Sequence, residues 1–171
     1  MIPSELVRKI SKKVGVTAGT FDLLHAGHVL MLKEAKEVCD YLIVLLHDDP
    51  SVSPPSYRSK KKSMPVMTVD ERKIILEGLR YVDEVISYAT EEDLYKLLVE
   101  LNPDIRIMGA DWFGKRYTGR DLPMKIHFND RKKDYSTSKL RERVYEAELA
   151  RLKEAGPAPA SAIDPLQLNL I

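Results

Sequence analysis

The stretch Lys13–Glu37 constrains the fold most, because it places a predicted strand, a glycine-containing turn and a predicted helix in direct succession. The pattern predicts a strand over Lys13–Thr20 and a helix over His28–Glu37. Doubly wound α/β sheets bind phosphates at such turns, since backbone N–H groups and the helix dipole converge there. Gly19 lets the backbone approach a ligand closely, and Gly27 keeps side-chain bulk away from the start of the helix. The stretch therefore predicts an anion site in an α/β fold.

Two histidines, His25 and His28, lie three residues apart in this turn. A single histidine is more often a structural residue, but two at this spacing behind a Gly-Thr turn favour a role at an anion. With His28 at the helix start, both imidazoles could donate to a phosphate. A zinc site would need further ligands at suitable spacing, and the chain offers no convincing set. We therefore predict catalytic histidines and no metal ion held directly by protein ligands.

Strands and helices alternate along the rest of the chain, which implies a parallel sheet built from crossover units. We expect an α/β, Rossmann-like three-layer sandwich with a parallel five-stranded sheet, formed by residues 1–155 and followed by an irregular or docked tail, 156–171. The expected elements after the first helix are a strand Tyr41–Leu46, a helix opened by a capping box Thr68–Glu71 and running to about Leu79, a strand Val82–Ser87, a helix Glu91–Leu101, strands Asp104–Met108 and Met124–Phe128, and a helix from Ser136 to about Glu154.

Composition limits the class of protein. A chain of 171 residues fits one domain. Its net charge of +1 is too small to attract nucleic acid or acidic membranes through a general electrostatic field. The single cysteine, Cys39, excludes an internal disulfide and is expected to pack inside the protein. The longest aliphatic run, Tyr41–Leu46, is too short to span a bilayer, and the first residues show no secretory segment. We expect a cytoplasmic protein with neither nucleic-acid nor membrane partners.

The string Thr17–His28, Thr-x-Gly-Thr-Phe-Asp-Leu-Leu-His-x-Gly-His, resembles the signature of the His-x-Gly-His nucleotidyltransferase superfamily. Within that superfamily it resembles the glycerol-3-phosphate cytidylyltransferases. Enzymes of this superfamily move a nucleoside monophosphate from CTP or ATP onto a phosphorylated acceptor and release pyrophosphate. The resemblance implies that both histidines stabilise the transition state, and that the nucleotide is bound by Thr17, Gly19, Thr20 and Phe21. Asp22 would either lie near the acceptor or stabilise the turn.

A second string, Arg131–Arg141, resembles the other signature of the superfamily, Arg-x-x-x-x-Ser-Thr-[Ser/Thr]-x-[Ile/Leu]-[Lys/Arg]. There the arginine, serine and threonine bind the β- and γ-phosphates, which implies the same role for Arg131, Ser136 and Thr137. Taken alone, the string also fits a capped helix preceded by a solvated basic turn. Lys132 departs from the relatives, which often carry threonine there.

A third string, Met108–Lys115, resembles the Met-Gly-x-Asp-Trp-x-Gly-Lys string of glycerol-3-phosphate cytidylyltransferases. Loops that follow the carboxyl ends of strands line the ligand crevice of such sheets. The resemblance places Gly109 and Asp111 at the nucleotide and Trp112 at the acceptor. Trp112 could instead be an ordinary core residue. Ala110 stands where the relatives carry an acidic residue.

Further predicted contacts lie between these strings. By the resemblance, Arg72 reaches toward the substrate phosphate, and Arg80–Ile86 lies near the contact of a homodimer. The same resemblance makes a lysine of Lys60–Lys62, for which we take Lys61, fold over the phosphates. This run could equally be a solvated charged segment. The strand end His47-Asp48-Asp49 lies at the sheet edge where ligands bind, and it could help read the acceptor or hold a Mg²⁺ water; we take His47 as an acceptor contact.

The sequence therefore predicts a nucleotidyltransferase that transfers CMP from CTP to a small phosphorylated alcohol or sugar, similar to glycerol 3-phosphate. Mg²⁺ would be bound through the triphosphate. One alternative is an adenylyltransferase that uses ATP with a heptose-phosphate or flavin-type acceptor. The other is a catalytically silent nucleotide-binding module.

Overall fold

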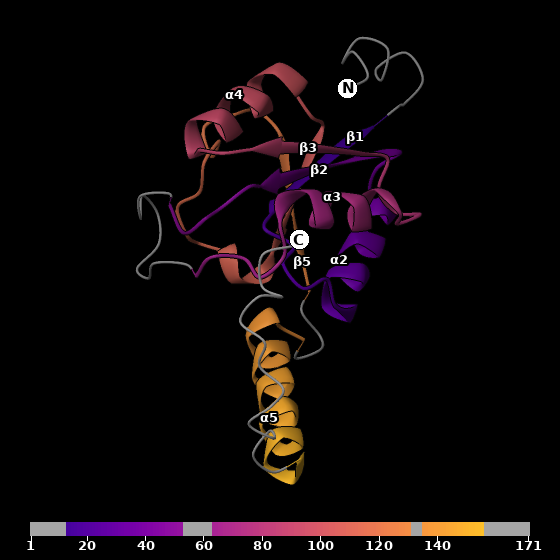
Figure 1. The fold of residues 1–171 in the computed structure, drawn as a ribbon. Helices are drawn as coiled ribbons and strands as arrows, with labels where there is room; N and C mark the ends of the chain where they lie inside the picture. The colour runs from indigo at the N-terminus through magenta and orange to yellow at the C-terminus, as the bar shows by residue number, and fades with distance from the viewer. Residues whose placement is uncertain (1–12, 53–62, 131–134, 156–171) are drawn as a thin grey trace. The chain divides into compact units, whose positions relative to one another are not determined.

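The computed structural model describes residues 13–52, 63–130 and 135–155. By its internal contacts the chain divides into two compact units, Met1–Thr137 and Ser138–Ile171. Strands and helices alternate through the first unit (Figure 1). The predicted tail, residues 156–171, lies outside the described residues, so the predicted domain boundary at residue 155 stays a prediction.

Five parallel strands form one sheet in the order β3-β2-β1-β4-β5. The strands are β1 (Val14–Gly19), β2 (Tyr41–His47), β3 (Glu84–Tyr88), β4 (Ile105–Gly109) and β5 (Lys125–Asn129). The predicted fold class is confirmed, and each strand lies within two residues of its predicted bounds. Because all pairs are parallel, the five carboxyl ends meet at one edge. The strand order reverses between β1 and β4, and such switch points hold the ligand crevice in open α/β sheets.

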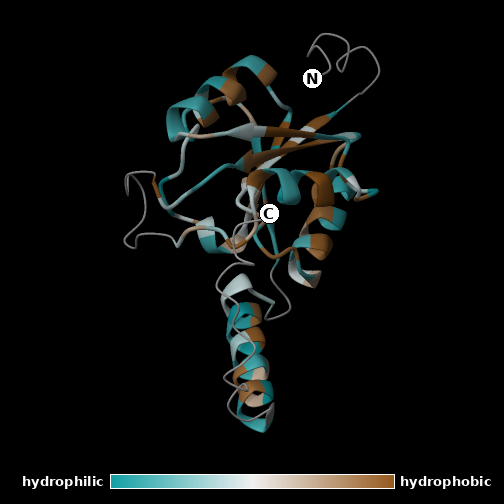
Figure 2. Cartoon of the chain, in the orientation of Figure 1, coloured by the Kyte–Doolittle hydropathy of each residue, from teal (hydrophilic) through white to brown (hydrophobic). Residues whose placement is uncertain are grey.

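Helices cover both faces of the sheet and make the fold a three-layer sandwich (Figure 1). On one face, α2 (Ala26–Glu37) and α3 (Val69–Glu77) enclose an apolar cluster, and α4 (Glu91–Leu101) encloses another on the opposite face. Fully buried side chains alternate between the two clusters along β2: Leu42, Val44 and Leu46 belong to the first, and Ile43 and Leu45 to the second. Hydrophobic residues accordingly follow the strands in Figure 2.

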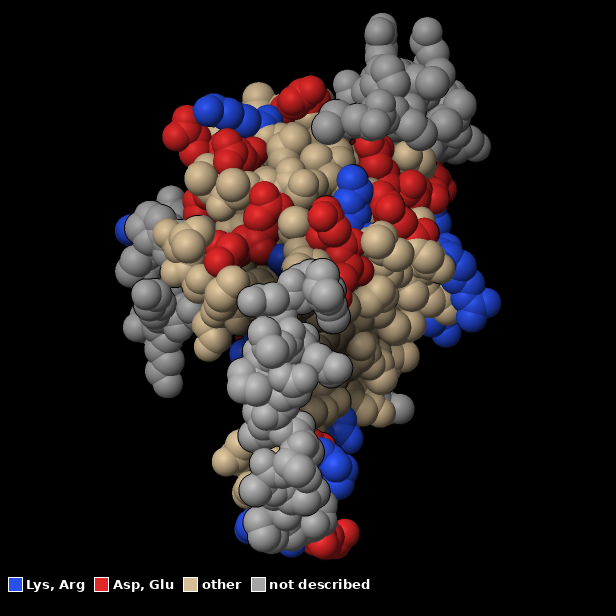
Figure 3. All heavy atoms as spheres, viewed as in Figure 1, with Lys and Arg blue, Asp and Glu red and all other residues tan. Residues whose placement is uncertain are grey.

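The starts of the helices differ in a way that bears on ligand binding. α3 and α4 begin with complete capping boxes, Thr68 with Glu71 and Thr90 with Asp93, and the first of these confirms a prediction. Both helices carry acidic residues in the first turn. Figure 3 shows acidic side chains in red on the surface formed by these helices. The first turn of α2 contains no acidic residue, so its positive dipole end is not neutralised by its own sequence.

Helix α2 starts at Ala26, two residues before the predicted start at His28. The reason is that the His25 side chain acts as N-cap and accepts a hydrogen bond from the Gly27 N–H, a role more usual for Ser, Thr, Asp or Asn. The buried Cys39 follows this helix, and its thiol donates to the Ala35 carbonyl. Burial raises the pKa of Cys39 to about 11, and the predicted packing role is confirmed.

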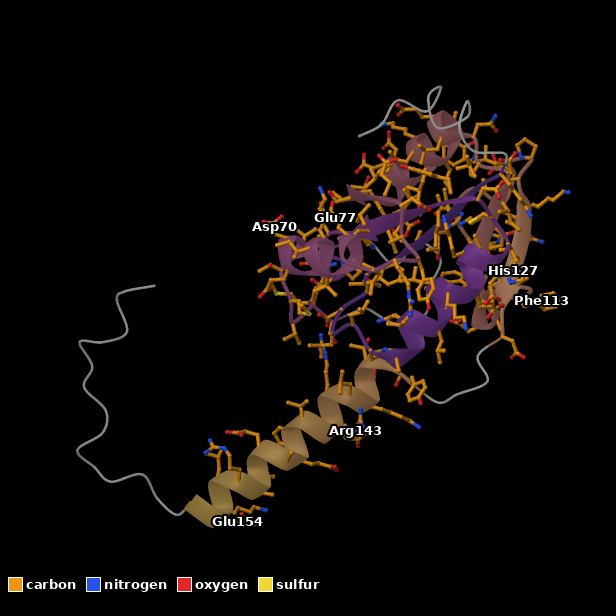
Figure 4. All side chains as sticks on the ribbon, turned by 90° about the vertical axis from the view of Figure 1, so that its right-hand side faces the viewer. Asp70, Glu77, Phe113, His127, Arg143 and Glu154 are labelled. Atoms are coloured by element: carbon orange, nitrogen blue, oxygen red, sulfur yellow. The ribbon has the colours of Figure 1, made fainter. Side chains whose placement is uncertain are left out.

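The second unit contains the rest of α5 (Thr137–Ala155), on which Figure 4 labels Arg143 and Glu154. Among the described residues, no helix combines the length and the apolar character that crossing a membrane requires.

Candidate functional site

The backbone of the turn between β1 and α2 is strained at two residues. Phe21 has φ 52° and Leu23 has φ 46°, in the left-handed region that non-glycine residues rarely adopt. The Phe21 side chain is buried, and its ring lies 5.3 Å from the His28 ring, centroid to centroid. Such conformations persist only where the surrounding packing enforces them, and they concentrate at functional sites. The sequence carried no signal for this strain.

The predicted histidine pair forms in the structure. The rings of His25 and His28 are stacked, with centroids 4.0 Å apart and an angle of 20° between planes. His25 caps α2 and His28 lies in its first turn, so both rings stand at the positive end of the helix. The arrangement places imidazole groups where an anion would be stabilised by the helix.

The cap fixes which nitrogen of His25 carries the proton. Nδ1 accepts the Gly27 N–H at 3.1 Å, so the proton of the neutral ring is on Nε2. This Nε2 lies 3.5 Å from the Thr137 hydroxyl oxygen, and the Thr137 hydroxyl itself donates to the Asp22 carbonyl at 3.1 Å. The Thr137 hydroxyl therefore lies on the Nε2 side of the His25 ring, and the second predicted string meets the first at this contact.

Gly27 is required by its neighbours. A Cβ at this position would lie 2.8 Å from Cβ of Tyr135 and 2.9 Å from Cε1 of His25. Either distance would force the backbone or the His25 ring to move. The sequence did not indicate that Tyr135 lies near the site, because its contact with Gly27 is visible only in the structure. The other glycine, Gly19, faces the Phe21 ring, which a Cβ would approach to 3.1 Å.

Asp22 holds the turn in place. Its side chain is buried, and Oδ1 accepts hydrogen bonds from the backbone N–H groups of Val66 and Met67, both at 3.0 Å. These bonds tie the β1–α2 turn to the segment that precedes α3. The geometry favours the turn-stabilising alternative for Asp22 over a contact with the acceptor.

Arg72 has a different position from the one predicted. Its buried guanidinium donates to five backbone carbonyls instead of extending toward a phosphate. The partners are Thr20 and His47 at 2.8 Å each, Asp48 at 2.5 Å, Met67 at 3.1 Å and Thr68 at 3.2 Å. Burial lowers the pKa of Arg72, and the nearby Asp22, Asp48 and Asp49 oppose that shift. Arg72 is therefore a positioning residue that joins the ends of β1 and β2 to the start of α3.

Two other predicted contact residues are also turned into the fold. His47 is buried, stacks on Tyr88 with centroids 4.7 Å apart, and places Nε2 3.2 Å from the Ala89 carbonyl, to which it donates. Thr17 lies inside β1, and its hydroxyl donates to the sulfur of Met31 at 3.9 Å. Alternation along the strands puts these side chains against the covering layers rather than at the edge.

The third string lies at the carboxyl end of β4, next to β1. Gly109 ends the strand, and Asp111 and Trp112 form the 3₁₀ turn η1 (Ala110–Trp112), with Asp111 exposed and Trp112 half-buried. Phe113 is 76% exposed and contacts Phe128 edge to face, with the rings 5.4 Å apart; Figure 4 shows it at the surface.

The half-buried Ser136 directly precedes α5, as the second string predicts. Predicted residues Lys61 and Arg131 lie outside the described residues. Within the described part of the chain, no group of three or more His, Cys, Asp or Glu side chains is arranged to hold a metal ion.

Comparison with known proteins places these strings in a family. A family model described as cytidylyltransferase-like matches residues 16–143. Glycerol-3-phosphate cytidylyltransferase from Bacillus subtilis (strain 168) is 37% identical over 133 residues, which cover 78% of this chain and 97% of that protein. The bifunctional protein HldE from Campylobacter concisus (strain 13826) is 37% identical over 142 residues, which cover 83% of this chain but only 29% of that protein.

Among solved structures, pantothenate synthetase from Thermus thermophilus has a TM-score of 0.52 at 14% identity, covering 91% of this chain and 75% of that one, a likeness of fold. The family match spans the stacked histidines, the strand switch point and the start of α5. The chain belongs to the cytidylyltransferase-like family.

Proposed function

We propose that the protein is a nucleotidyltransferase that transfers CMP from CTP to a small phosphorylated alcohol or sugar and releases pyrophosphate. The observation that carries the proposal is the stacked pair of His25 and His28 at the start of α2. Membership of the cytidylyltransferase-like family supports the reaction type. The cytidylyltransferase relative, nearly all of whose length this chain covers, supports CTP as the donor.

The electrostatics of the helix starts support a phosphate site at α2. Its first turn lacks acidic residues, whereas the first turns of α3 and α4 contain Asp70 and Glu71, and Glu91, Glu92 and Asp93. Carboxylates neutralise the dipole at those two helices, so an anion gains more at α2. The histidines add hydrogen-bond donors at the same place.

In the proposed reaction an oxygen of the acceptor phosphate attacks the α-phosphorus in line. The bond from that phosphorus to the bridging oxygen breaks, and pyrophosphate leaves with the electron pair. The Nε2–H of His25 donates to an α-phosphate oxygen as charge develops there, and His28 supplies a second donor. Since the cap already orients His25, the donor requires little reorganisation. No enzyme nucleophile takes part.

The remaining predicted residues have supporting roles in this proposal. Thr20, Phe21, Gly109, Asp111, Ser136 and Thr137 would line the nucleotide site, and Trp112 the acceptor site. Arg131 and Lys61 would hold the phosphates, as the resemblance implies. Mg²⁺ carried by the triphosphate would neutralise charge on the departing pyrophosphate. A homodimer and a cytoplasmic location complete the proposal.

The test is pyrophosphate release with Mg²⁺, comparing CTP with ATP against glycerol 3-phosphate, phosphocholine, phosphoethanolamine and heptose 1-phosphate. We expect release with CTP and at least one acceptor, and a loss of at least about 10²-fold in kcat for His28→Ala with an unchanged melting temperature. Release only with ATP would assign the protein to the adenylyltransferases. Nucleotide binding without release for any acceptor, or near-normal activity of His28→Ala, would contradict the proposal.

A further inference from the structure

The second half of helix α5 exposes a strip of hydrophobic side chains. Tyr145, Leu149 and Leu152 are 68%, 37% and 53% exposed, and Figure 2 shows hydrophobic residues along this helix. At about 100° per residue, the three side chains fall within a sector of about 60° on the helix surface. They form one narrow apolar face, the α5 strip. The described part of the second unit is α5 alone, so no described residue of that unit covers the strip.

The α5 strip lies outside the part of the chain that the family model matches. That match ends at residue 143, and all three residues of the strip follow it. A helical stretch of this length is marginally stable in water by itself, and it usually depends on the packing of its apolar face. The family's domain therefore does not account for the strip, and its partner has to be sought elsewhere.

The spacing of the strip indicates what kind of partner fits it. Tyr145, Leu149 and Leu152 are separated by four and then three residues, as successive d and a positions are in a coiled coil. The tail, residues 156–171, has a different pattern: it contains three prolines, and its leucines over Leu166–Leu170 alternate with polar residues. A period of two does not match the face of a helix. The spacing therefore favours a second helix over the tail as the partner.

We propose that the α5 strip docks against the same strip of a second copy of this chain, as a short parallel pair of helices. A second copy supplies a helix of the required spacing. This contact is separate from the homodimer contact that the resemblance implies near Arg80–Ile86, and it does not depend on the proposed function.

The charges beside the strip favour this pairing. In a parallel pair, the residue before an a position faces the residue five positions later on the other helix. Glu148 then faces Lys153 of the second copy, and Arg141 faces Glu146, so each cross-pair contact joins opposite charges. Glu148 also pairs with Arg151 in its own helix, with Oε1 2.6 Å from Nη2. This mixture of charges differs from the polar face of a helix that binds membranes, which is rich in Lys and Arg.

Disulfide cross-linking of the full chain tests the contact. Leu152→Cys places a thiol where the two strips meet, and Ala147→Cys, the matched control, places one on the opposite side of the same helix. The native Cys39 is buried and its pKa is raised to about 11, so it contributes little to oxidation in either variant. Under the same mild oxidation, we expect at least about 10-fold more disulfide-linked dimer from Leu152→Cys than from Ala147→Cys.

Charge reversal tests the register of the pair. In the Leu152→Cys background, Lys153→Glu should lower the yield of linked dimer about 3- to 10-fold, because it places a carboxylate opposite Glu148 of the other copy. Adding Glu148→Lys should restore most of the yield. Residues 148 and 153 are not neighbours on the surface of one helix, so this restoration reports a contact between copies.

Three results would overturn the inference. The first is an equal yield of linked dimer from Leu152→Cys and Ala147→Cys. The second is a yield that Lys153→Glu leaves unchanged or that Glu148→Lys does not restore. The third is a linked dimer of Leu152→Cys that forms only after residues 156–171 are removed, since the tail would then cover the strip.

Discussion

His25 combines two roles that usually belong to different residues. Through Nδ1 it caps α2, and through Nε2 it presents a proton toward Thr137 and the proposed phosphate site. The cap removes the ambiguity of tautomer and holds the ring against His28. Orientation of the donor is thus built into the start of the helix, before any ligand binds.

The two roles of His25 can be separated by substitution. Asparagine is among the best N-caps, so His25→Asn should keep the stability within about 0.5 kcal/mol of wild type, whereas His25→Ala should lose about 1 kcal/mol. Both should lose at least about 10²-fold in kcat, because neither supplies the Nε2–H. Urea unfolding and steady-state kinetics measure the two effects. A His25→Asn enzyme with near-normal kcat would contradict the donor role.

A methyl group added at Gly27 should lower both the stability of the protein and its activity. Gly27→Ala would bring a Cβ to 2.8 Å from Tyr135 and 2.9 Å from the His25 ring. We expect a loss of about 1–3 kcal/mol in stability and at least about 10-fold in kcat, because the ring must move.

Gly78→Ala is the matched control for this substitution. Gly78 ends α3 with helical φ of −75°, and the nearest atoms to a Cβ there are backbone oxygens at 3.5 and 3.6 Å. Alanine should be neutral or stabilise the protein by up to about 1 kcal/mol. Thermal melting and steady-state kinetics measure both substitutions. Equal effects would show that the site does not require a glycine at position 27.

At the scale of the elements, Arg72 joins three pieces of the fold. Its hydrogen bonds reach the residue after β1, the last residue of β2 and the segment that opens α3. A guanidinium can donate in several directions within one plane, which an ammonium cannot. The relative position of β1 and β2 at the ligand edge therefore depends on this side chain.

Arg72→Lys should accordingly destabilise the protein by about 3 kcal/mol, because several backbone carbonyls, that of the buried His47 among them, lose their donors. For a chain of this size that corresponds to a fall of roughly 6–12 °C in melting temperature. Arg80→Lys is the control, since Arg80 is exposed and lies over the Tyr81 ring at 5.2 Å. A melting temperature of Arg72→Lys equal to that of the control would show that the junction does not stabilise the fold.

The capping boxes of α3 and α4 make the stability depend on pH. Hydrogen bonds from the backbone and hydroxyl of Thr68 lower the pKa of Glu71 from its ordinary 4.5, and those from the hydroxyl and backbone of Thr90 lower that of Asp93 from 3.8. A carboxylate whose pKa is lower in the folded state stabilises the fold above its unfolded pKa. That stabilisation is lost as the pH falls through the folded value.

Replacing both carboxylates, in Glu71→Gln/Asp93→Asn, should therefore lower the stability at pH 6 but weaken its decline between about pH 5 and about pH 3. Urea unfolding curves of the wild type and the double variant at these three pH values measure the difference. Parallel stability curves for the two proteins would show that the boxes do not contribute to the acid dependence.

For the whole molecule, local patterns predicted the order and type of the elements because alternation and capping act over a few residues. They predicted the strands within two residues and the capping box at Thr68. The two strings that meet at His25 and Thr137 were also predicted to act together, although 112 residues separate them.

Side-chain direction could not be predicted in the same way. An arginine can bind either a phosphate or a set of backbone carbonyls. Arg72 binds carbonyls because the ends of β1 and β2 place those of Thr20 and His47 within its reach. His47 and Thr17 turned inward because strand alternation and the covering helices set their faces. The left-handed Phe21 and Leu23 depend on tertiary packing, for which a short sequence window holds no signal.

The central claim is transfer at the α-phosphorus, with the stacked histidines as donors. It is tested most directly by following label from [α-³²P]CTP and [γ-³²P]CTP, with Mg²⁺ and glycerol 3-phosphate, in the wild type and His28→Ala. The account predicts α-label in the CMP-linked product, γ-label only in pyrophosphate, and at least about 10²-fold less product with the variant. Transfer of γ-label to the acceptor, or release of α-label only as free nucleotide, would contradict it.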